Sequence, residues 1–282
     1  MNRSKVSKAT LAAAAAVALA LSAGACGGDG GNGGSGSGDG DKITVGIKFD
    51  QPGLGLKTPD GTYTGFDVDV ATYVAKELGY EPGDIVWKEA KSADRETLLQ
   101  RGDVDFIAAT YSINDERAQK VDFAGPYLLA HQDVLIRADD DTIKSPADLN
   151  AKKLCSVTGS TSAQNVKTKL APDAQLQEYG GYSECLTGLE NNAIDALTTD
   201  DSILAGYAAQ DEFKGKFKLG GFEMSNENYG IGVQKGSELK AQINTALEKM
   251  VEDGSWDTYV KKNFGPANYQ NEPAPKIGVI VD

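Results

Sequence analysis

The sequence predicts an α/β fold of two lobes, and two observations support this prediction. From residue 42 onward, short runs of apolar and β-branched residues alternate with segments whose apolar residues recur every three or four positions. Alternating strands and helices build βαβ units around a mainly parallel sheet. The alternation starts again after residues 131–136, and two such runs indicate two α/β lobes.

The first run contains three expected strands and two expected helices. Val70, Val74 and Leu78 form one apolar stripe, which is typical of a helix, and Gly79 is its expected end. The second helix is expected over 94–101, and the strands are expected over 43–47, 84–87 and 104–109.

The second run is followed by two further helices and a tail. Its strands are expected over 154–157, 176–179 and 194–198, and its helices over 162–170 and 185–191. One later helix covers 239–250, and Ser255 is the expected N-cap of the last one. The tail after Pro266 is expected to wrap the surface, with residues 277–281 docking as a strand.

The charge balance excludes some classes of function. The chain has 28 Lys and Arg residues against 41 Asp and Glu residues, which gives a formal net charge of -13. Proteins bind nucleic acids largely because their basic residues release counterions from the phosphate backbone. A chain this acidic lacks that driving force, so we expect no nucleic-acid partner. His131 is the only histidine, which argues against histidine-based metal sites, and we expect no metal.

Residues 1–25 have the pattern of an export signal. Three basic residues precede an apolar run over 9–21 that is too short for a stable membrane anchor. Small residues then lead directly to Cys26, as in a bacterial lipobox, where the cysteine is diacylated after cleavage. An ordinary signal peptide cut near Ala25 is the alternative. We favour lipidation, because a lone cysteine at this edge has no packing role.

A flexible tether follows the cysteine. Nine of the fifteen residues over 27–41 are glycine, and such a segment cannot bury apolar surface. Removal of residues 1–25 takes away three basic residues and no acidic one, so the mature chain has 25 basic and 41 acidic residues, a charge of -16. We expect a lipid-anchored domain held at the extracellular face of the cell membrane.

Cys155 and Cys185 are the two remaining cysteines. An even pair in an exported protein predicts a disulfide, and two buried thiols are the alternative. The spacing is not that of a redox-active pair, so we expect a structural role.

Four blocks of sequence carry a resemblance to a known family. They are GFDVDV at 65–70, GDVDF at 102–106 with TYSINDER at 110–117, VTGST at 157–161 and IDALTTD at 194–200. In this order they resemble family 3 of the extracellular solute-binding proteins, which serve polar amino-acid ABC importers. The lipobox, the glycine-rich tether and GIKFDQPG at 46–53 look most like actinobacterial glutamate-binding lipoproteins.

The resemblance implies a two-lobed, periplasmic-binding-protein-like fold of type II with a ligand cleft between the lobes. The chain would cross between lobes near 130–132 and again near 226–229, and these crossings would form the hinge. The domain boundaries are expected as follows: signal peptide 1–25, lipidated cysteine and tether 26–41, lobe 1 at 43–131 plus 229–264, lobe 2 at 132–228, and tail 265–282.

The resemblance also implies how an amino acid would be held. Arg117 would face the α-carboxylate, for which a planar guanidinium suits two parallel hydrogen bonds. Ser112 and Thr161 would share that carboxylate, one from each lobe. Asp200 would hold the α-ammonium, helped by the carbonyl or hydroxyl of Thr110.

Each of these positions has a competing interpretation. The charged run that contains Arg117 is also typical of a solvated face. Asp201 and Asp195 are rivals of Asp200. Ser160 and Ser162 compete with Thr161 for the donor role at the start of the following helix.

Side-chain specificity depends on further cations. A ligand with a side-chain carboxylate needs one, because an unpaired buried charge costs several kcal/mol. Lys48 and Arg95 lie where acidic-amino-acid binders of the family carry arginines, and either could pair with a γ-carboxylate; the alternatives are a solvated lysine and a surface-helix arginine. Thr199, Tyr111 and Gln51 could line the rest of the pocket, which leaves glutamine and aspartate open as ligands.

The resulting prediction is a monomeric binding protein that captures L-glutamate and delivers it to the membrane subunits of an ABC permease. No cofactor, no catalytic residue and no enzymatic activity are expected. One alternative is a ligand-binding sensor that signals through a membrane receptor or kinase. The other is an enzyme on the same fold, such as a dehydratase.

Overall fold

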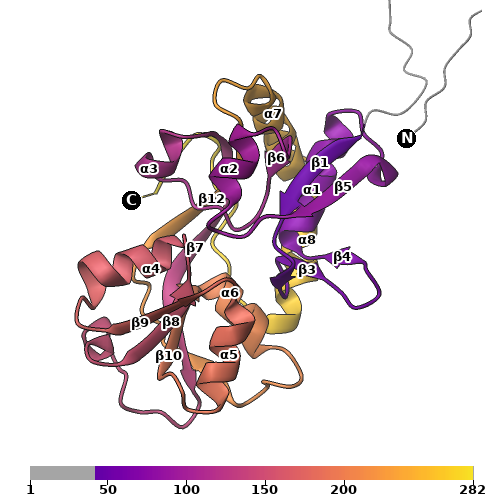
Figure 1. The fold of residues 1–282 in the computed structure, drawn as a ribbon. Helices are drawn as coiled ribbons and strands as arrows, with labels where there is room; N and C mark the ends of the chain where they lie inside the picture. The colour runs from indigo at the N-terminus through magenta and orange to yellow at the C-terminus, as the bar shows by residue number, and fades with distance from the viewer. Residues whose placement is uncertain (1–41, 282) are drawn as a thin grey trace, which may run out of the picture. The chain divides into compact units, whose positions relative to one another are not determined.

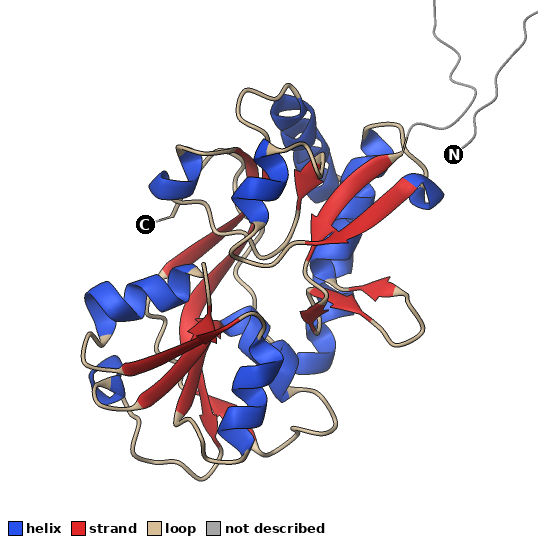
Figure 2. Ribbon diagram, in the orientation of Figure 1, coloured by secondary structure: helices blue, strands red, loops and turns tan. Residues whose placement is uncertain are grey.

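The computed structural model describes residues 42–281, and the predicted signal peptide, Cys26 and the tether lie outside the described residues. The fold is mixed α/β (Figures 1 and 2). Its main sheet has nine strands in the order β5-β1-β6-β12-β7-β10-β8-β9, with β11 paired to β7. A separate small sheet has the order β2-β3-β4. The predicted fold class is confirmed.

The first lobe is built on parallel pairs of β1 with β5 and with β6. The predicted helix stripe is present, since Val70 and Val74 of α1 are buried in the core. The strands of this lobe are β1 (Ile43–Ile47), β2 (Asp50–Gln51), β3 (Gly55–Lys57), β4 (Tyr63–Thr64), β5 (Ile85–Glu89) and β6 (Phe106–Ile107). Its helices are α1 (Phe66–Glu77), α2 (Arg95–Gln100), α3 (Asp115–Ala118), α7 (Leu239–Glu252) and α8 (Ser255–Phe264).

The second lobe repeats the pattern with β8 parallel to both β9 and β10. Helix α4 continues into a π-helical segment, Val166–Leu170, so the predicted helix over 162–170 contains two helical types. The other elements are β8 (Lys153–Val157), β9 (Gln175–Tyr179), β10 (Ala196–Asp200), β11 (Phe217–Leu219), α4 (Thr161–Asn165), α5 (Tyr182–Glu190) and α6 (Asp201–Ala208). Short 3-10 segments lie at Pro82–Asp84, Pro146–Leu149 and Gly265–Ala267.

Two long strands connect the lobes. β7 (Asp122–Arg137) pairs with β12 (Asn226–Val233) over its first half and with β10 over its second half. Ala130 lies opposite Glu227 and His131 opposite Asn226, so the antiparallel pair passes through both predicted crossings (Figure 1). We keep 43–131 with 229–264, and 132–228, as the proposed lobe boundaries.

Residues 131–136, after which the second run of elements begins, form the second half of β7, and the chain continues without a break from one lobe into the other. Two sequence predictions need correction. Ser255 is the first residue of α8, and the N-cap is Gly254, whose φ of 78° is left-handed. Residues 277–281 form no strand. They are held instead by Gly278, which donates to the Gly125 carbonyl, and by Val281, whose backbone exchanges two hydrogen bonds with the Asn228 side chain.

An aromatic cluster fixes the start of α1 in the core. The Phe66 ring lies 6.1 Å from the Tyr127 and Trp256 rings and 5.1 Å from the Phe264 ring, centroid to centroid. Gly65 precedes it at a φ of 126°, and an added Cβ would lie 2.0 Å from the Leu54 carbonyl oxygen. Only glycine fits such a close approach. The GFDVDV block therefore positions α1, and with it Asp67.

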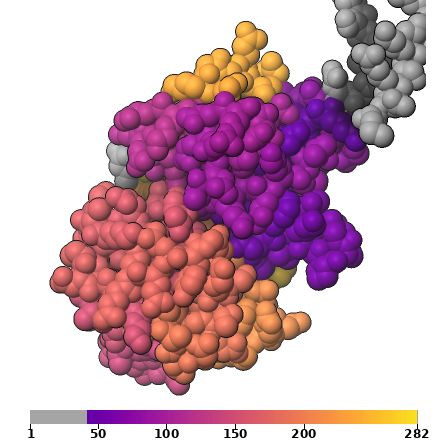
Figure 3. All heavy atoms as spheres, in the orientation of Figure 1, coloured from indigo at the N-terminus to yellow at the C-terminus, as the bar shows by residue number. Residues whose placement is uncertain are grey.

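The lobes touch on the face shown in Figure 3, where indigo and violet atoms of the first lobe abut salmon and orange atoms of the second. Asp50 carries part of this contact: its carboxylate accepts from the Tyr182 N–H at 3.3 Å, and its carbonyl accepts from the Tyr207 hydroxyl at 2.6 Å. Within residues 42–281, no helix has the length and apolarity needed to cross a membrane.

The predicted disulfide is present and joins Cys155 of β8 to Cys185 of α5. Both residues are fully buried in the core. The bond closes a loop between residues 30 positions apart, which restricts the unfolded chain.

Reduction of this disulfide should lower the free energy of unfolding by about 3 to 4 kcal/mol, because the unfolded chain regains the entropy of the open loop. Urea unfolding with and without a thiol reductant measures the difference. The double variant Cys155→Ala/Cys185→Ala is the control, since its stability should not respond to reductant. Equal stability of the oxidised and reduced wild-type protein would contradict the prediction.

Candidate functional site

A small polar cavity lies between the two lobes and contains about 230 Å³ of space free of atoms. Seven of the eight residues predicted to bind ligand line it, and Lys48 does not. The lining is Ser92, Arg95, Thr110, Ser112, Arg117, Ser160, Thr161, Ser162, Tyr182, Thr199, Asp200 and Ile203. Within the described chain, no group of three or more His, Cys, Asp or Glu side chains is placed to hold a metal ion.

Arg117 bridges the two lobes. One Nη donates to the Ser112 carbonyl at 2.8 Å, and the other donates across the cleft to the Gly159 carbonyl at 2.9 Å. Its Nε lies 3.6 Å from a Glu96 carboxylate oxygen. The side chain is only 6% exposed, so the solvated-face interpretation is wrong. These contacts hold the guanidinium plane still at the edge of the cavity.

The close approach of the lobes at Gly159 requires glycine. Its φ is 79°, and an added Cβ would lie 2.8 Å from the Ala93 Cα. The VTGST block therefore brings the start of α4 against the loop that carries Ser92. The Ser160 hydroxyl caps α4 by accepting from the Ala163 N–H, and Ser160, Thr161 and Ser162 all line the cavity.

Arg95 is a second buried cation beside the first. It is 2% exposed, which rules out a surface-helix role. One Nη donates to the carbonyls of Ala109 and Thr110, while its buried Nε has no hydrogen-bond partner. Arg95 and Arg117 both lie over the Tyr111 ring, with guanidinium carbons 4.2 and 5.2 Å from its centroid. The ring face is electron-rich and offsets part of the cost of placing two cations together.

Lys48 lies behind the cavity wall. It is 4% exposed, so it is not a solvated loop lysine. Its Nζ donates to the Ser92 hydroxyl at 2.9 Å, and Ser92 is the residue that lines the cavity. Burial and the nearby Arg95 charge lower the pKa of Lys48 to about 7. Among the described residues, no carboxylate lies within 4 Å of the charged atoms of Lys48 or Arg95.

Asp200 is the buried acid of the cavity. The Tyr229 hydroxyl donates to one of its oxygens at 2.6 Å and the Ser162 hydroxyl to the other at 3.3 Å. Burial, reinforced by the Glu227 charge, raises the pKa of Asp200 well above its usual range. A cation bound beside Asp200 would lower this pKa and favour the ionised carboxylate. Its rival Asp201 is absent from the cavity lining and instead accepts from the His131 N–H and the Tyr269 hydroxyl.

Asp67 holds Thr110 in an uncommon backbone conformation. Thr110 has a φ of 46°, which a β-branched residue adopts only under constraint. Its N–H donates to one Asp67 oxygen at 2.9 Å, and the Tyr127 hydroxyl donates to the other at 2.7 Å. The Thr110 hydroxyl donates to the Ala109 carbonyl, which leaves its oxygen able to accept a hydrogen bond in the cavity.

The rest of the lining closes the pocket from lobe 2. The Tyr182 and Thr199 hydroxyls share a hydrogen bond of 2.6 Å. The Thr161 hydroxyl donates to Glu227 at 2.9 Å. Sequence reasoning missed Ser92, Tyr182 and Ile203 as lining residues, because each depends on how distant loops and helices pack. Tyr111 and Gln51, which were expected at the pocket, lie outside its lining.

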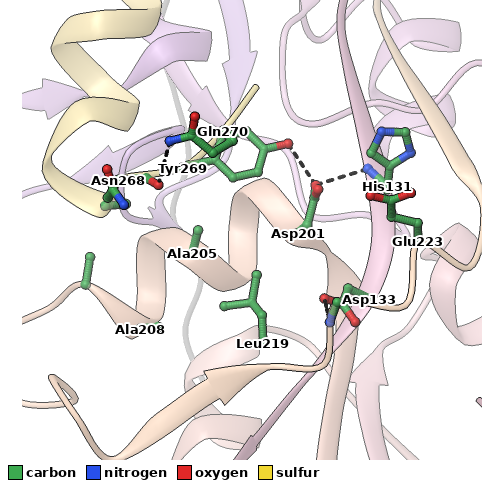
Figure 4. A pocket seen from close by; sticks show the side chains of 13 residues that line it. His131, Asp133, Asp201, Ala205, Ala208, Leu219, Glu223, Asn268, Tyr269 and Gln270 are labelled. Atoms are coloured by element: carbon green, nitrogen blue, oxygen red, sulfur yellow. Dashed lines mark hydrogen bonds between the residues drawn. The ribbon is translucent and has the colours of Figure 1, made fainter. Parts of the chain in front are cut away.

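A larger hollow lies elsewhere, between α6, the loop after β11 and residues 267–270 (Figure 4). In Figure 4 the Tyr269 hydroxyl points at the Asp201 carboxylate. Asp133, Asp201 and Glu223 line this hollow, and no Lys or Arg does. It offers no permanent cation for a ligand carboxylate.

The cavity between the lobes therefore has two chemically different parts. Arg117 offers a fixed cation, and Asp200 offers a carboxyl group that a bound ammonium would ionise, which suits the two charges of a free amino acid. Arg95 offers positive charge to a second charged group of a ligand. Ser92, which accepts a hydrogen bond from Lys48, offers a hydroxyl beside it. Hydrogen bonding and charge complementarity suffice for binding.

The variant Asp67→Asn should lower the free energy of unfolding by about 1 to 3 kcal/mol. Asp67 accepts two hydrogen bonds, one on each oxygen, and an amide would set its NH₂ group against one of the donors. Chemical denaturation measures the change. The exposed Asp257→Asn in α8 is the matched control and should be neutral. An Asp67→Asn protein as stable as wild type would show that Asp67 does not hold Thr110.

The chain is similar to known amino-acid-binding proteins. A family model described as "Bacterial extracellular solute-binding proteins, family 3" matches residues 43–266. The glutamate-binding protein GluB of Corynebacterium efficiens is 50% identical over 234 residues, which cover 79% of each chain. The ABC transporter glutamine-binding protein GlnH of Bacillus subtilis is 42% identical over 225 residues, 79% of this chain and 81% of GlnH. A solved ancestral arginine-binding protein bound to glutamine has a TM-score of 0.74 and 36% identity, and the match covers 80% of this chain and 98% of the other.

Proposed function

Because this chain belongs to family 3 of the bacterial extracellular solute-binding proteins, we propose that it captures L-glutamate between its lobes and delivers it to an ABC import permease. The observation that carries the choice of ligand is the pair of buried cations, Lys48 and Arg95, that have no acid partner of their own within the described chain. Its GluB relatives are named as glutamate-binding proteins, which supports the same choice.

The α-carboxylate lies against Arg117 in this proposal. The two remaining Nη hydrogens of the guanidinium provide parallel, charge-assisted donors. Ser112 from lobe 1 and the backbone N–H of Thr161, the first residue of α4 in lobe 2, are the additional donors. The α-ammonium lies between Asp200 and the Thr110 hydroxyl oxygen, and its charge favours the ionised form of Asp200.

The γ-carboxylate lies toward Arg95 and Ser92. A carboxylate there neutralises buried positive charge, whereas the amide of glutamine leaves it in place. Thr199 and Tyr182 line the same cavity from lobe 2. Aspartate is one methylene shorter, and we expect it to reach the two groups of anchors less well than glutamate.

Ligand binding and closure are one event in this proposal. Arg117 and Asp200 belong to different lobes, so a bound amino acid contacts both and shifts the population toward the closed form. The closed surface is then what a permease recognises. The relative GlnH, named as part of an ABC transporter, supports this partner.

Calorimetric titration with glutamate, glutamine and aspartate tests the ligand. Glutamate should bind about tenfold or more tighter than the other two. The variant Arg117→Met should lose about 100-fold or more in affinity for glutamate, about 2.7 kcal/mol, because it removes the partner of a desolvated carboxylate.

The exposed Arg101→Met at the end of α2 is the matched control and should bind as wild type. An Arg117→Met affinity within about tenfold of wild type would show that the α-carboxylate anchor is misplaced. Glutamine or aspartate binding more tightly than glutamate would overturn the proposed ligand.

We also propose that a lipid on Cys26 holds the protein at the extracellular face of the membrane, with residues 27–41 as a tether. The small residues before Cys26 and the glycine-rich segment after it support this proposal. In cells that express the full chain, Cys26→Ala should move the protein from the membrane fraction to the medium. Cys155→Ala/Cys185→Ala should stay with the membrane. A Cys26→Ala protein retained in the membrane fraction would refute lipidation at this residue.

A further inference from the structure

The pair formed by Lys48 and Ser92 has a property that the proposed function does not use. An ammonium can only donate a hydrogen bond. When Lys48 is charged, it occupies a lone pair of the Ser92 oxygen, and the Ser92 proton is free to point into the cavity. When Lys48 is neutral, its nitrogen can accept the Ser92 proton, and the Ser92 oxygen then faces the cavity as an acceptor.

We propose that Lys48 and Ser92 form a proton-linked selector, in which charged Lys48 makes Ser92 a donor for the carboxylate of glutamate and neutral Lys48 makes it an acceptor for the amide of glutamine. This inference rests on the proposed function, since it assumes that the ligand side chain lies at Ser92. Lys48 is thus a positioning residue that acts through Ser92 and does not touch the ligand.

The groups around Lys48 allow both its charged and its neutral form near neutral pH. Its side chain is buried, and Arg95 of α2 and Arg117 of α3 oppose its charge. Asp50 of β2, Glu89 of β5 and Asp67 of α1 favour the charge, but none forms an ion pair with it. The pKa of Lys48 near 7 follows from this balance, with desolvation as the largest cause.

A bound γ-carboxylate changes this balance. It adds a negative charge near Lys48 and raises its pKa, so glutamate binding takes up a proton from solvent at the Lys48 amine. The amide of glutamine carries no charge and gives no such uptake. By linkage, glutamate affinity falls as the pH rises above the pKa of free Lys48, by at most about tenfold per pH unit.

Asp200 titrates as well, but it affects both ligands alike. Both carry the same α-ammonium, which favours ionised Asp200 and releases its proton. The ratio of the two dissociation constants therefore removes this contribution and isolates the side-chain end of the cavity.

The test is calorimetric titration with glutamate and with glutamine from about pH 6 to about pH 8.5. The ratio of the glutamine to the glutamate dissociation constant should fall by about tenfold over this range. At neutral pH, titrations in buffers of different ionisation enthalpy should show greater net proton uptake for glutamate than for glutamine.

Three variants separate the possible causes. Lys48→Met should flatten the pH dependence of the ratio. Ser92→Ala should weaken it, leaving only the direct effect of the γ-carboxylate charge on Lys48. Lys91→Met removes an exposed lysine next to Ser92 and should behave as wild type. A full pH dependence in Ser92→Ala would overturn the role of Ser92, and a full dependence in Lys48→Met would overturn that of Lys48.

The wild-type protein alone decides the proposal if a variant fails to fold. A ratio that does not change with pH, while both ligands bind, would overturn the selector and leave the proposed function standing. Absence of binding by either ligand would instead overturn the proposed function.

Discussion

The cavity depends on the burial of positive charge that the protein itself leaves without a counterion. Lys48 and Arg95 are almost fully buried, and within the described chain neither has an acid within ion-pair distance. Such burial costs several kcal/mol per charge unless it is offset. Backbone carbonyls and the Tyr111 ring provide part of the compensation. In the proposed function, the anionic side chain of the ligand provides the remainder. In a chain with a net charge of -13, this small region gathers buried positive charge.

The same side chains connect ligand recognition to the arrangement of the lobes. Arg117 donates to a carbonyl of each lobe, and Tyr229 on the strand β12 that joins the lobes donates to Asp200. A change at the hinge therefore moves the groups that read the two charges of an amino acid. Binding energy and closure share these contacts, which is how a binding protein signals occupancy through its shape.

Much of the fold and the site follows from the sequence, because local patterns determine them. Alternating strand and helix runs predicted both lobes, and the family resemblance predicted seven of the lining residues. What the sequence could not predict depends on tertiary packing. β7 continues through both lobes without a local signal for its length, and α6 begins directly after Asp200. Lys48 lies behind Ser92 because two loops of lobe 1 meet, and spacing along the chain says nothing about that.

The central claim is that one glutamate spans the cavity, with its α-carboxylate on Arg117 and its γ-carboxylate toward Arg95 and Ser92. A crystal structure of the protein with glutamate tests it most directly. Both carboxylates should lie within hydrogen-bond distance, about 2.7 to 3.2 Å, of these groups, with the ammonium on Asp200. A glutamate whose side chain points away from Arg95, or one bound in the hollow beside Tyr269, would contradict it.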